Sequence, residues 1–316
     1  MKDIGKLMAV GSAALRKAAV HDEAKQYILG HEKLYRLFSK AASRYVAGET
    51  LPAAVARAAQ YNQQGLATSI EFMGENVKDE HEAAAATAEF LAICDQIASK
   101  GLKSNVSLDL SHIGLALSAD LCRQHLAQLC EKAGQVGIEV MISAEDTAKT
   151  DAVLDMYLGM AGRYEHLGIT VQAYLHRTRD DFKQLIQRPN RIRLVKGAFD
   201  TPEGLSLPRG GELNQAYLAY LDQLLASHHT CSIATHDPLI QQEAVKLLSR
   251  HQMPQQAYEF ESLLGIATDQ LLDLMRAGHP AKMYIVYGQE WYLYLCNRIA
   301  ENPMNLFLAL EDIMQS

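Results

Sequence analysis

Short apolar or β-branched segments recur along the chain about every 20 to 40 residues, and amphipathic helical patterns lie between them. The apolar segments occupy residues 68–72, 106–110, 139–143, 170–174, 191–195, 231–235, 257–261 and 282–286. The main helical patterns occupy residues 80–99, 119–133, 150–164, 213–226, 238–250 and 269–277. Strands that alternate with helices pair in parallel. Eight such units on roughly 250 residues predict an α/β fold, a (β/α)8 barrel, rather than an open doubly wound sheet with its smaller usual strand number.

The chain before the first strand has no strand pattern and contains an Ala-rich helical stretch near its start. No Pro/Gly/Ser-rich linker and no run of like charges divides the sequence. We therefore expect residues 1–64 to form a helical segment that caps the barrel, and residues 65–316 to form the barrel itself.

Composition narrows the class of function. The 316 residues are 48% hydrophobic and 21% charged, which suits one large core, and the net charge of −7 comes without a basic block interleaved with aromatics. A small-molecule partner is therefore expected, and a nucleic acid is not. No apolar run reaches membrane-spanning length, and the five cysteines contain no C-x-x-C pair. These features favour a cytoplasmic protein with reduced core cysteines, and contact with a membrane surface stays open.

Polar residues gather where the predicted strands end, which is where barrel enzymes carry their chemistry. Each of these residues, taken alone, could have a purely structural role. His236 could cap a helix or pack in the core, and Tyr284 could be a core residue. The joint placement of all of them indicates a site. The residues, in strand order, are Glu71, Glu75, Asp109, Ser111, His112, Ser143 to Asp146, Gln172, Tyr174, Arg193, Lys196, Thr235, His236, Asp237, Glu259, Glu261, Tyr284 and Tyr287.

The segment 192–199 is the most specific of these strand ends. An apolar strand there carries Arg193 and Lys196 to a turn at Gly197, so two cations and free backbone amides occur together. This combination suits an anionic, partly aromatic cofactor, although a strand with a solvated basic end would have the same pattern. H-x-H and H-E-x-x-H pairs, a nucleophile elbow and G-x-G-x-x-G after a strand are all lacking. A metal site, an acyl-transfer triad and a nicotinamide site are therefore not expected.

The segments 65–75, 171–174, 192–198, 233–237, 258–260 and 284–294 together resemble the proline dehydrogenase family, in its short, single-function form. The resemblance implies a distorted (β/α)8 barrel that binds FAD and oxidises proline to pyrroline-5-carboxylate. The hydride would leave the carbon next to nitrogen for the flavin, and a quinone or another acceptor would reoxidise the flavin. The partners expected are thus a small amine or imino acid and an electron acceptor.

The resemblance also suggests roles for individual residues. Catalytic positions would be Arg193, at the reactive edge of the flavin ring, and Ser143. The cofactor would contact Ala144, Gln172, Arg193, Lys196, Gly197, Ala198, Thr235 and His236. The substrate would contact Asp109, Tyr284, Tyr294, Asn297, Arg298 and Glu301. On a helix, Tyr294, Arg298 and Glu301 are spaced i, i+4 and i+7 and share one face.

The chain departs from the family pattern in the substrate pocket. Asp109 stands where the family has a lysine, and Asn297 where it has the first of two arginines; Ser143 replaces an aspartate and Phe199 a tyrosine. The formal charge of the pocket becomes more negative by two. A carboxylate would lose charge-assisted partners there, each worth roughly 1.5 to 3 kcal/mol. We therefore expect a proline-like secondary amine whose carboxylate is altered or masked. Alternatives are an ordinary proline dehydrogenase with a compensating pocket and a non-catalytic flavin-binding relative.

Overall fold

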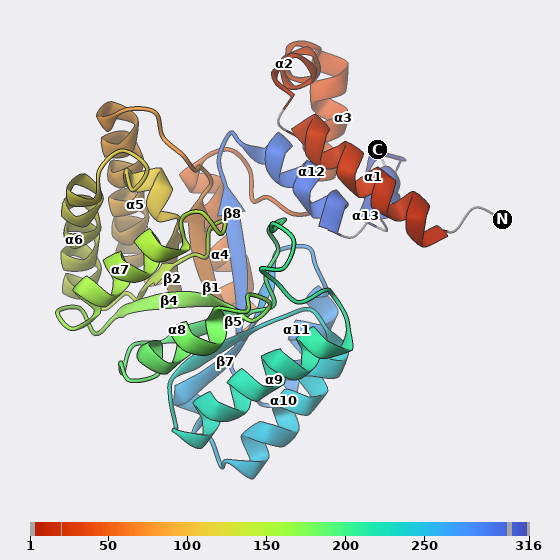
Figure 1. The fold of residues 1–316 in the computed structure, drawn as a ribbon. Coiled ribbons are helices and arrows are strands. Elements are labelled where there is room, and N and C mark those ends of the chain that lie inside the picture. Colours follow the sequence, from red (N-terminus) through yellow and green to blue (C-terminus); the bar gives the residue numbers. More distant parts are fainter. Residues whose placement is uncertain (1–3, 20, 302–304, 315–316) are drawn as a thin grey trace.

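The computed structural model describes residues 4–19, 21–301 and 305–314. Within these ranges eight parallel strands close into one barrel in sequence order (Figure 1). The predicted barrel is therefore confirmed, and each strand falls within a few residues of its predicted segment. The strands are β1 (Ala67–Phe72), β2 (Ser104–Leu108), β3 (Val140–Ile142), β4 (Leu167–Gln172), β5 (Ile192–Val195), β6 (Cys231–Ala234), β7 (Tyr258–Leu263) and β8 (Ala281–Tyr287).

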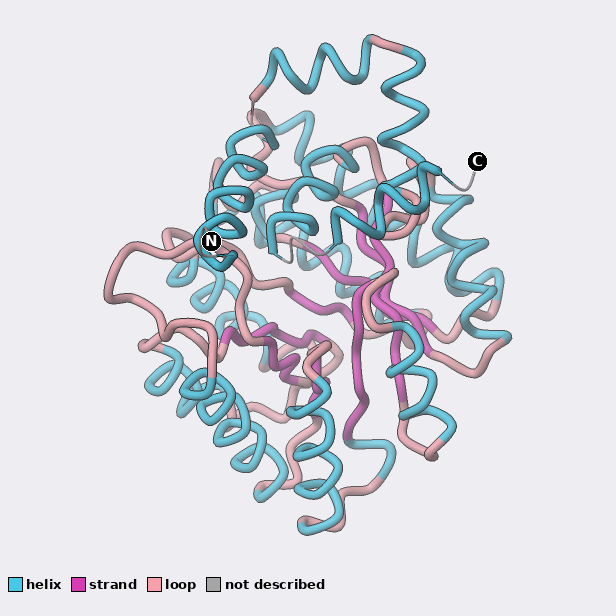
Figure 2. Tube along the Cα trace, turned by 90° about the vertical axis from the view of Figure 1, so that its right-hand side faces the viewer, coloured by secondary structure: helices cyan, strands magenta, loops and turns pink. Residues whose placement is uncertain are grey.

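Helices surround the strands as an outer ring (Figure 2). The six predicted helical patterns are found as α5 (Glu80–Lys100), α6 (Ala119–Gln135), α7 (Thr150–Ala161), α9 (Gly211–Ala226), α10 (Pro238–Arg250) and α11 (Thr268–Arg276). Their starts follow local chemistry: Asp79 accepts a hydrogen bond from the Glu82 amide, and Asp237 accepts from Leu239 ahead of a first-turn proline. The short helix α8 (Thr178–Leu185) follows β4 and was not predicted. A 3-10 turn, η1 (Leu110–Ile113), follows β2, and another, η2 (Gln255–Ala257), precedes β7.

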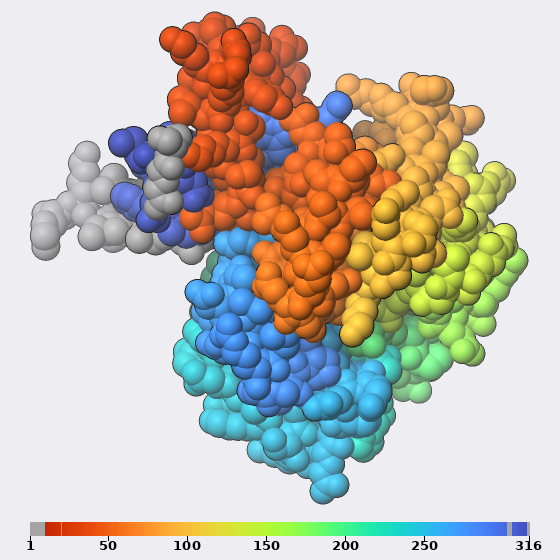
Figure 3. All heavy atoms as spheres, turned by 180° about the vertical axis from the view of Figure 1, so that it is seen from behind, coloured from red at the N-terminus to blue at the C-terminus, as the bar shows by residue number. Residues whose placement is uncertain are grey.

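A second helical layer covers the C-terminal end of the barrel. It comprises α1 (Ile4–Ala19), α2 (Asp22–Gly30) and α3 (Glu32–Ala42), together with α12 (Trp291–Glu301) and α13 (Asn305–Met314), whereas α4 (Leu51–Gln63) packs on β1 and β8. Helix α1 packs on α12, and α13 packs on α3, so the two ends of the chain lie side by side (Figure 3). Ion pairs from Lys25 to Glu290 at 2.7 Å and from Arg44 to Asp312 at 2.6 Å join them. A boundary at residue 64 stays a prediction.

The barrel interior holds a polar layer at the N-terminal end of the strands. There Lys282 Nζ lies 2.6 Å from Glu259, and Arg191 Nε lies 2.9 Å from Glu139. Each of these charged groups has a partner of opposite charge. The layer of ion pairs fills this end of the barrel at a lower desolvation cost than unpaired charges would have. The five cysteines are free and buried, as predicted. No helix among the described residues is long and apolar enough to cross a membrane.

Candidate active site

A cavity of about 680 Å³ opens at the C-terminal ends of the strands, beneath α12. All the site residues predicted from the sequence line it, which brings them together as the barrel rule requires. Their individual roles stay predictions. Other residues named from the sequence do not line the cavity and have structural contacts. Tyr287 donates a hydrogen bond to Glu89 at 2.7 Å, and the His112 ring stacks on the Phe72 ring with 5.0 Å between their centres. Glu259 belongs to the polar layer at the N-terminal end of the strands.

Arg193, the second residue of β5, lines the cavity from inside the barrel. It is 4% exposed, and its guanidinium donates hydrogen bonds to Thr170 Oγ1 at 2.8 Å, Ser143 Oγ at 3.1 Å and Glu261 Oε1 at 3.2 Å. The Tyr284 ring lies 4.9 Å from the guanidinium carbon, in cation–π geometry. These contacts hold the planar guanidinium inside the barrel, where it faces the cavity. Burial raises the pKa of Glu261 even though Arg193 opposes this effect.

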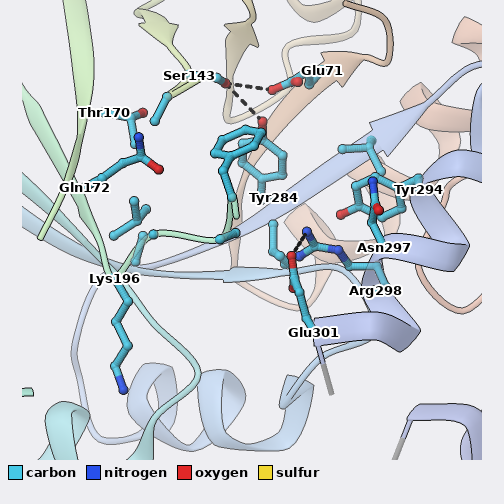
Figure 4. Close-up of a pocket in the computed structure, with 18 of the residues that line it drawn as sticks. Glu71, Ser143, Thr170, Gln172, Lys196, Tyr284, Tyr294, Asn297, Arg298 and Glu301 are labelled. Atoms are coloured by element: carbon cyan, nitrogen blue, oxygen red, sulfur yellow. Dashed lines mark hydrogen bonds and ion pairs between the residues drawn. The ribbon is translucent and has the colours of Figure 1, made fainter. Parts of the chain in front are cut away.

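Glu71 and Ser143 form a second network beside Arg193 (Figure 4). Ser143 Oγ donates to Glu71 Oε2 at 3.0 Å and lies 3.4 Å from the Tyr284 hydroxyl. Burial raises the pKa of Glu71 to about 7, against the effects of Arg193 and of the serine bond. A carboxyl group that changes charge near neutral pH inside a cavity is suited to proton transfer.

Two further carboxyls line the same side of the cavity. Asp109 follows β2 and is half-buried, and Glu75 stands exposed on the rim beyond β1. Burial first, and then the charges of Glu71 and Glu145, raise the pKa of Asp109 well above its ordinary value. Burial and Glu145 also raise the pKa of Glu75, although Lys149 opposes them. This side is therefore acidic, and its groups repel one another.

The opposite side, after β4, β5 and β6, is built differently. Lys196 extends away from the tyrosines in Figure 4 and forms a 2.6 Å ion pair with Asp237. Gly197 has a φ of +111°, and a Cβ there would lie 2.2 Å from the Tyr174 ring, so only glycine fits this turn. Gln172 donates to the Glu145 carbonyl at 3.1 Å, which fixes the side-chain amide at the cavity wall.

Thr235 and His236 close this side after β6. The Thr235 carbonyl accepts a hydrogen bond from Gln241 at 2.8 Å, and His236 Nε2 accepts one from the Leu263 amide at 2.9 Å. Burial, with a smaller effect of Arg298, lowers the pKa of His236 to about 4. The imidazole is therefore neutral at pH 7 and serves as a fixed wall of the cavity.

Helix α12 supplies the roof, with Tyr294, Arg298 and Glu301 on one face, as the spacing predicted. The Arg298 guanidinium lies 5.0 Å from the Tyr294 ring centre and forms an ion pair with Glu301. Its Nε is buried and has no hydrogen-bond acceptor in the described part of the chain. Asn297 also lines the cavity. The roof therefore offers a donor that a ligand can use.

The sequence reasoning assigned no substrate or cofactor role to several lining residues, among them Glu71, Glu261, Thr170 and Arg209. The two glutamates were visible as strand-end carboxyls, but nothing local indicated that their side chains face Arg193. Period-two alternation from Arg193 along the paired strands would have placed Thr170 on the same face, because these residues pair in register. Arg209 comes from the loop before α9, where no periodic signal exists.

The sequence is similar to that of a known protein family over most of its length. Residues 54–307 match the family described as proline dehydrogenase. The chain is 34% identical over 295 residues to proline dehydrogenase 1 of Bacillus subtilis (strain 168), covering 91% of this chain and 97% of that protein. It is 28% identical over 293 residues to the proline dehydrogenase of Deinococcus radiodurans, covering 91% and 93%.

A solved structure shares the fold. Proline utilization A from Bdellovibrio bacteriovorus, inactivated by N-propargylglycine, superposes with a TM-score of 0.79 at 18% sequence identity. The match covers 93% of this chain and 36% of that one, so the chain spans about a third of the longer protein. At this identity the likeness concerns the fold alone.

Proposed function

The chain belongs to the proline dehydrogenase family, and we propose that it oxidises proline or a proline-like secondary amine with FAD as its cofactor. Hydride leaves the carbon next to nitrogen and the product is an imine, which is pyrroline-5-carboxylate if the substrate is proline. The observation that carries the proposal is Arg193, a buried cation that lies within β5 and is held by hydrogen bonds in the lining of the cavity. A planar charge held there stabilises the negative charge that an electron-accepting ring develops.

The residues present fit FAD. The side of the cavity after β3 to β6 is lined by the small residues Ala144, Gly197 and Ala198, which leave room for a flat ring. Its polar end carries Lys196 and Arg209, which suit the phosphates. Glycine at position 197 lets the backbone approach closely, since any side chain would meet the Tyr174 ring. FAD, when bound, supplies the hydride acceptor, and Gln172, Thr235 and His236 complete its wall.

Glu71 is the group of this chain best suited to move a proton. A protonated secondary amine must lose its proton before hydride can leave the adjacent carbon, because the nitrogen lone pair drives the departure. Glu71 Oε2 is held by the Ser143 hydroxyl, and its pKa of about 7 makes the carboxylate available near neutral pH. Tyr284 and Tyr294 form aromatic walls that hold a small ring in place.

We also propose that a quinone or another acceptor reoxidises the flavin, and that the protein is cytoplasmic and touches a membrane surface at most peripherally. Helix α13 carries exposed Leu306 and Phe307 and would be the first surface to test for such contact.

The visible spectrum of the purified protein tests the proposal. We expect a yellow protein whose flavin bleaches anaerobically when a suitable amine is added. Arg193→Ala should slow the bleaching or weaken flavin binding, whereas Arg276→Ala, an exposed arginine paired with Asp273 at 2.8 Å, should change neither. A colourless protein that takes up no added FAD would refute the proposal. A yellow protein that no amine reduces would instead support the non-catalytic relative.

A further inference from the structure

We propose that the preferred substrate is a secondary amine that carries, in place of a carboxylate, a neutral or cationic group with N–H donors. The inference rests on the proposed function and names the substrate class of that site. It follows from the charge and pairing of the groups that line the cavity.

Carboxyl groups line the β1–β2 side of the cavity without cationic partners. Neither Asp109 nor Glu75 makes a side-chain hydrogen bond or an ion pair with any described residue, and Glu71 bonds only to the neutral Ser143. The nearest groups that act on Asp109 are mainly other carboxyls, with Arg193 opposing them last and least. A ligand in the cavity therefore meets acceptors on this side.

Most cations that line the cavity already form ion pairs with carboxylates of the protein. Arg193 is paired with Glu261, Lys196 with Asp237, and Arg298 with Glu301. Arg209, the remaining cation of the lining, is exposed and donates to the Gly197 carbonyl at 3.4 Å, on the side away from β1 and β2. Each of these four lining cations thus already has a protein acceptor, and Arg298 keeps one buried donor, Nε, without an acceptor in the described part of the chain.

The roof restricts the substituent further. Arg298 Nε is a buried donor without an acceptor, and the Asn297 amide can both donate and accept. A carboxamide offers a carbonyl acceptor, which suits the unpaired donor of Arg298, and N–H donors, which suit the carboxyl groups of the cavity; an aminomethyl group offers the carboxyl groups a cation. A carboxylate adds a further negative charge beside carboxyl groups that already repel one another, and so raises their pKa values further. Of the three substituents, the carboxylate fits worst.

Three probes share the pyrrolidine ring and differ in the charge of its substituent. The substituent is negative in proline, neutral in prolinamide and positive in 2-(aminomethyl)pyrrolidine. Binding is measured by thermal stabilisation of the FAD-loaded protein after reduction with dithionite, so that no probe can be oxidised during the measurement. Anaerobic bleaching of the oxidised protein gives the rates. The variant Asp109→Asn removes one carboxyl charge at nearly constant shape. Asp155→Asn makes the same change at an exposed position on α7 and is the matched control.

We expect prolinamide and 2-(aminomethyl)pyrrolidine to bind at least about tenfold more tightly than proline, the scale of one charge-assisted contact. Asp109→Asn should narrow that preference by a similar factor, and Asp155→Asn should leave it unchanged. Tightest binding by proline, binding by none of the probes, or an unchanged preference in a folded Asp109→Asn protein would each overturn the inference. If that variant does not fold, the order of the probes on the native protein decides. A protein that binds no flavin refutes the proposed function separately, and thermal stabilisation of that flavin-free protein by the three probes still gives their binding order.

Discussion

Replacing Glu71 with glutamine should stabilise the fold and slow the reaction at the same time. The pKa of Glu71 is about 7 in the folded protein against an ordinary value of 4.5, because burial disfavours the charged form. The folded state thus holds the proton more tightly than the unfolded chain. The contribution of Glu71 to stability is therefore fully present below pH 4.5 and is lost as the pH rises towards 7. A difference of about 2.5 pH units corresponds to about 3 kcal/mol of lost stability above pH 7.

Glutamine resembles the protonated carboxyl and can still accept the Ser143 hydroxyl. Glu71→Gln should therefore raise the free energy of unfolding by up to about 3 kcal/mol at pH 8 and by little at pH 4. Urea unfolding at the two pH values measures this gain. Glu243→Gln, at an exposed residue paired with Lys246, should stay within about 0.5 kcal/mol of the parent. A destabilised Glu71→Gln protein at pH 8 would show that the carboxylate contributes more through Arg193 than its burial costs.

The same variant tests proton transfer. In the parent protein the rate of flavin reduction should rise as the pH increases through about 7, because the carboxylate form accepts the proton. Glu71→Gln should lower that rate about 10²-fold or more and remove this inflection. Stopped-flow reduction across pH 5 to 9 gives the profile. An unchanged profile would assign the proton acceptor to another group.

The remaining predictions concern the cofactor turn and the substrate pocket. Gly197→Ala should reduce both the flavin content and the melting temperature, because the φ of +111° and the Tyr174 ring leave no space for a Cβ; retention of both would contradict the turn described here. Arg298→Ala should raise KM for the true substrate, and Arg298→Lys should restore little of it, since lysine lacks the planar fork; equal kinetics in all three proteins would place the substrate elsewhere. Asp109→Lys combined with Asn297→Arg should increase kcat/KM for free proline about 10²-fold, and no increase would mean that the pocket already accommodates a carboxylate.

The fold could be predicted from the sequence because its eight strands are short and are separated by amphipathic helices. Several barrel strands alternate apolar residues with buried polar ones such as Ser69, Ser107 and Ser232, and this short-period pattern contrasts with that of the helices. Helix α8 was missed because it has few apolar positions and only eight residues, and its buried Phe182 and Leu185 are too few to give a clear period. Tertiary packing, rather than a local pattern, determines that helix.

The site was predictable to the extent that barrels collect strand ends. Ser143 lies directly after β3, as that rule predicts, whereas Arg193 and Tyr284 lie within β5 and β8 and reach the cavity from inside the barrel. The hydrogen bonds of these residues could not be predicted, since residues 23 to 141 positions apart in sequence make them. The role of Glu71 could not be read at all. Its raised pKa depends on burial and on neighbouring carboxyls, and both result from closing the barrel.

The carboxyl groups of Glu71, Asp109 and Glu75 destabilise the folded protein when they are charged, and this argues against a purely structural role for them. Burial and mutual repulsion raise the pKa values of Glu71, Asp109 and Glu75, so each charge is disfavoured in the folded protein at neutral pH. A structural role would instead pair these groups with cations, as the lower layer pairs Glu259 with Lys282 at 2.6 Å. Unpaired carboxyls that line a cavity are relieved by a ligand with N–H donors or positive charge. The same barrel thus has a layer of ion pairs that stabilises it and a wall of three carboxyl groups without ion-pair partners among the described residues, which a bound amine would supply.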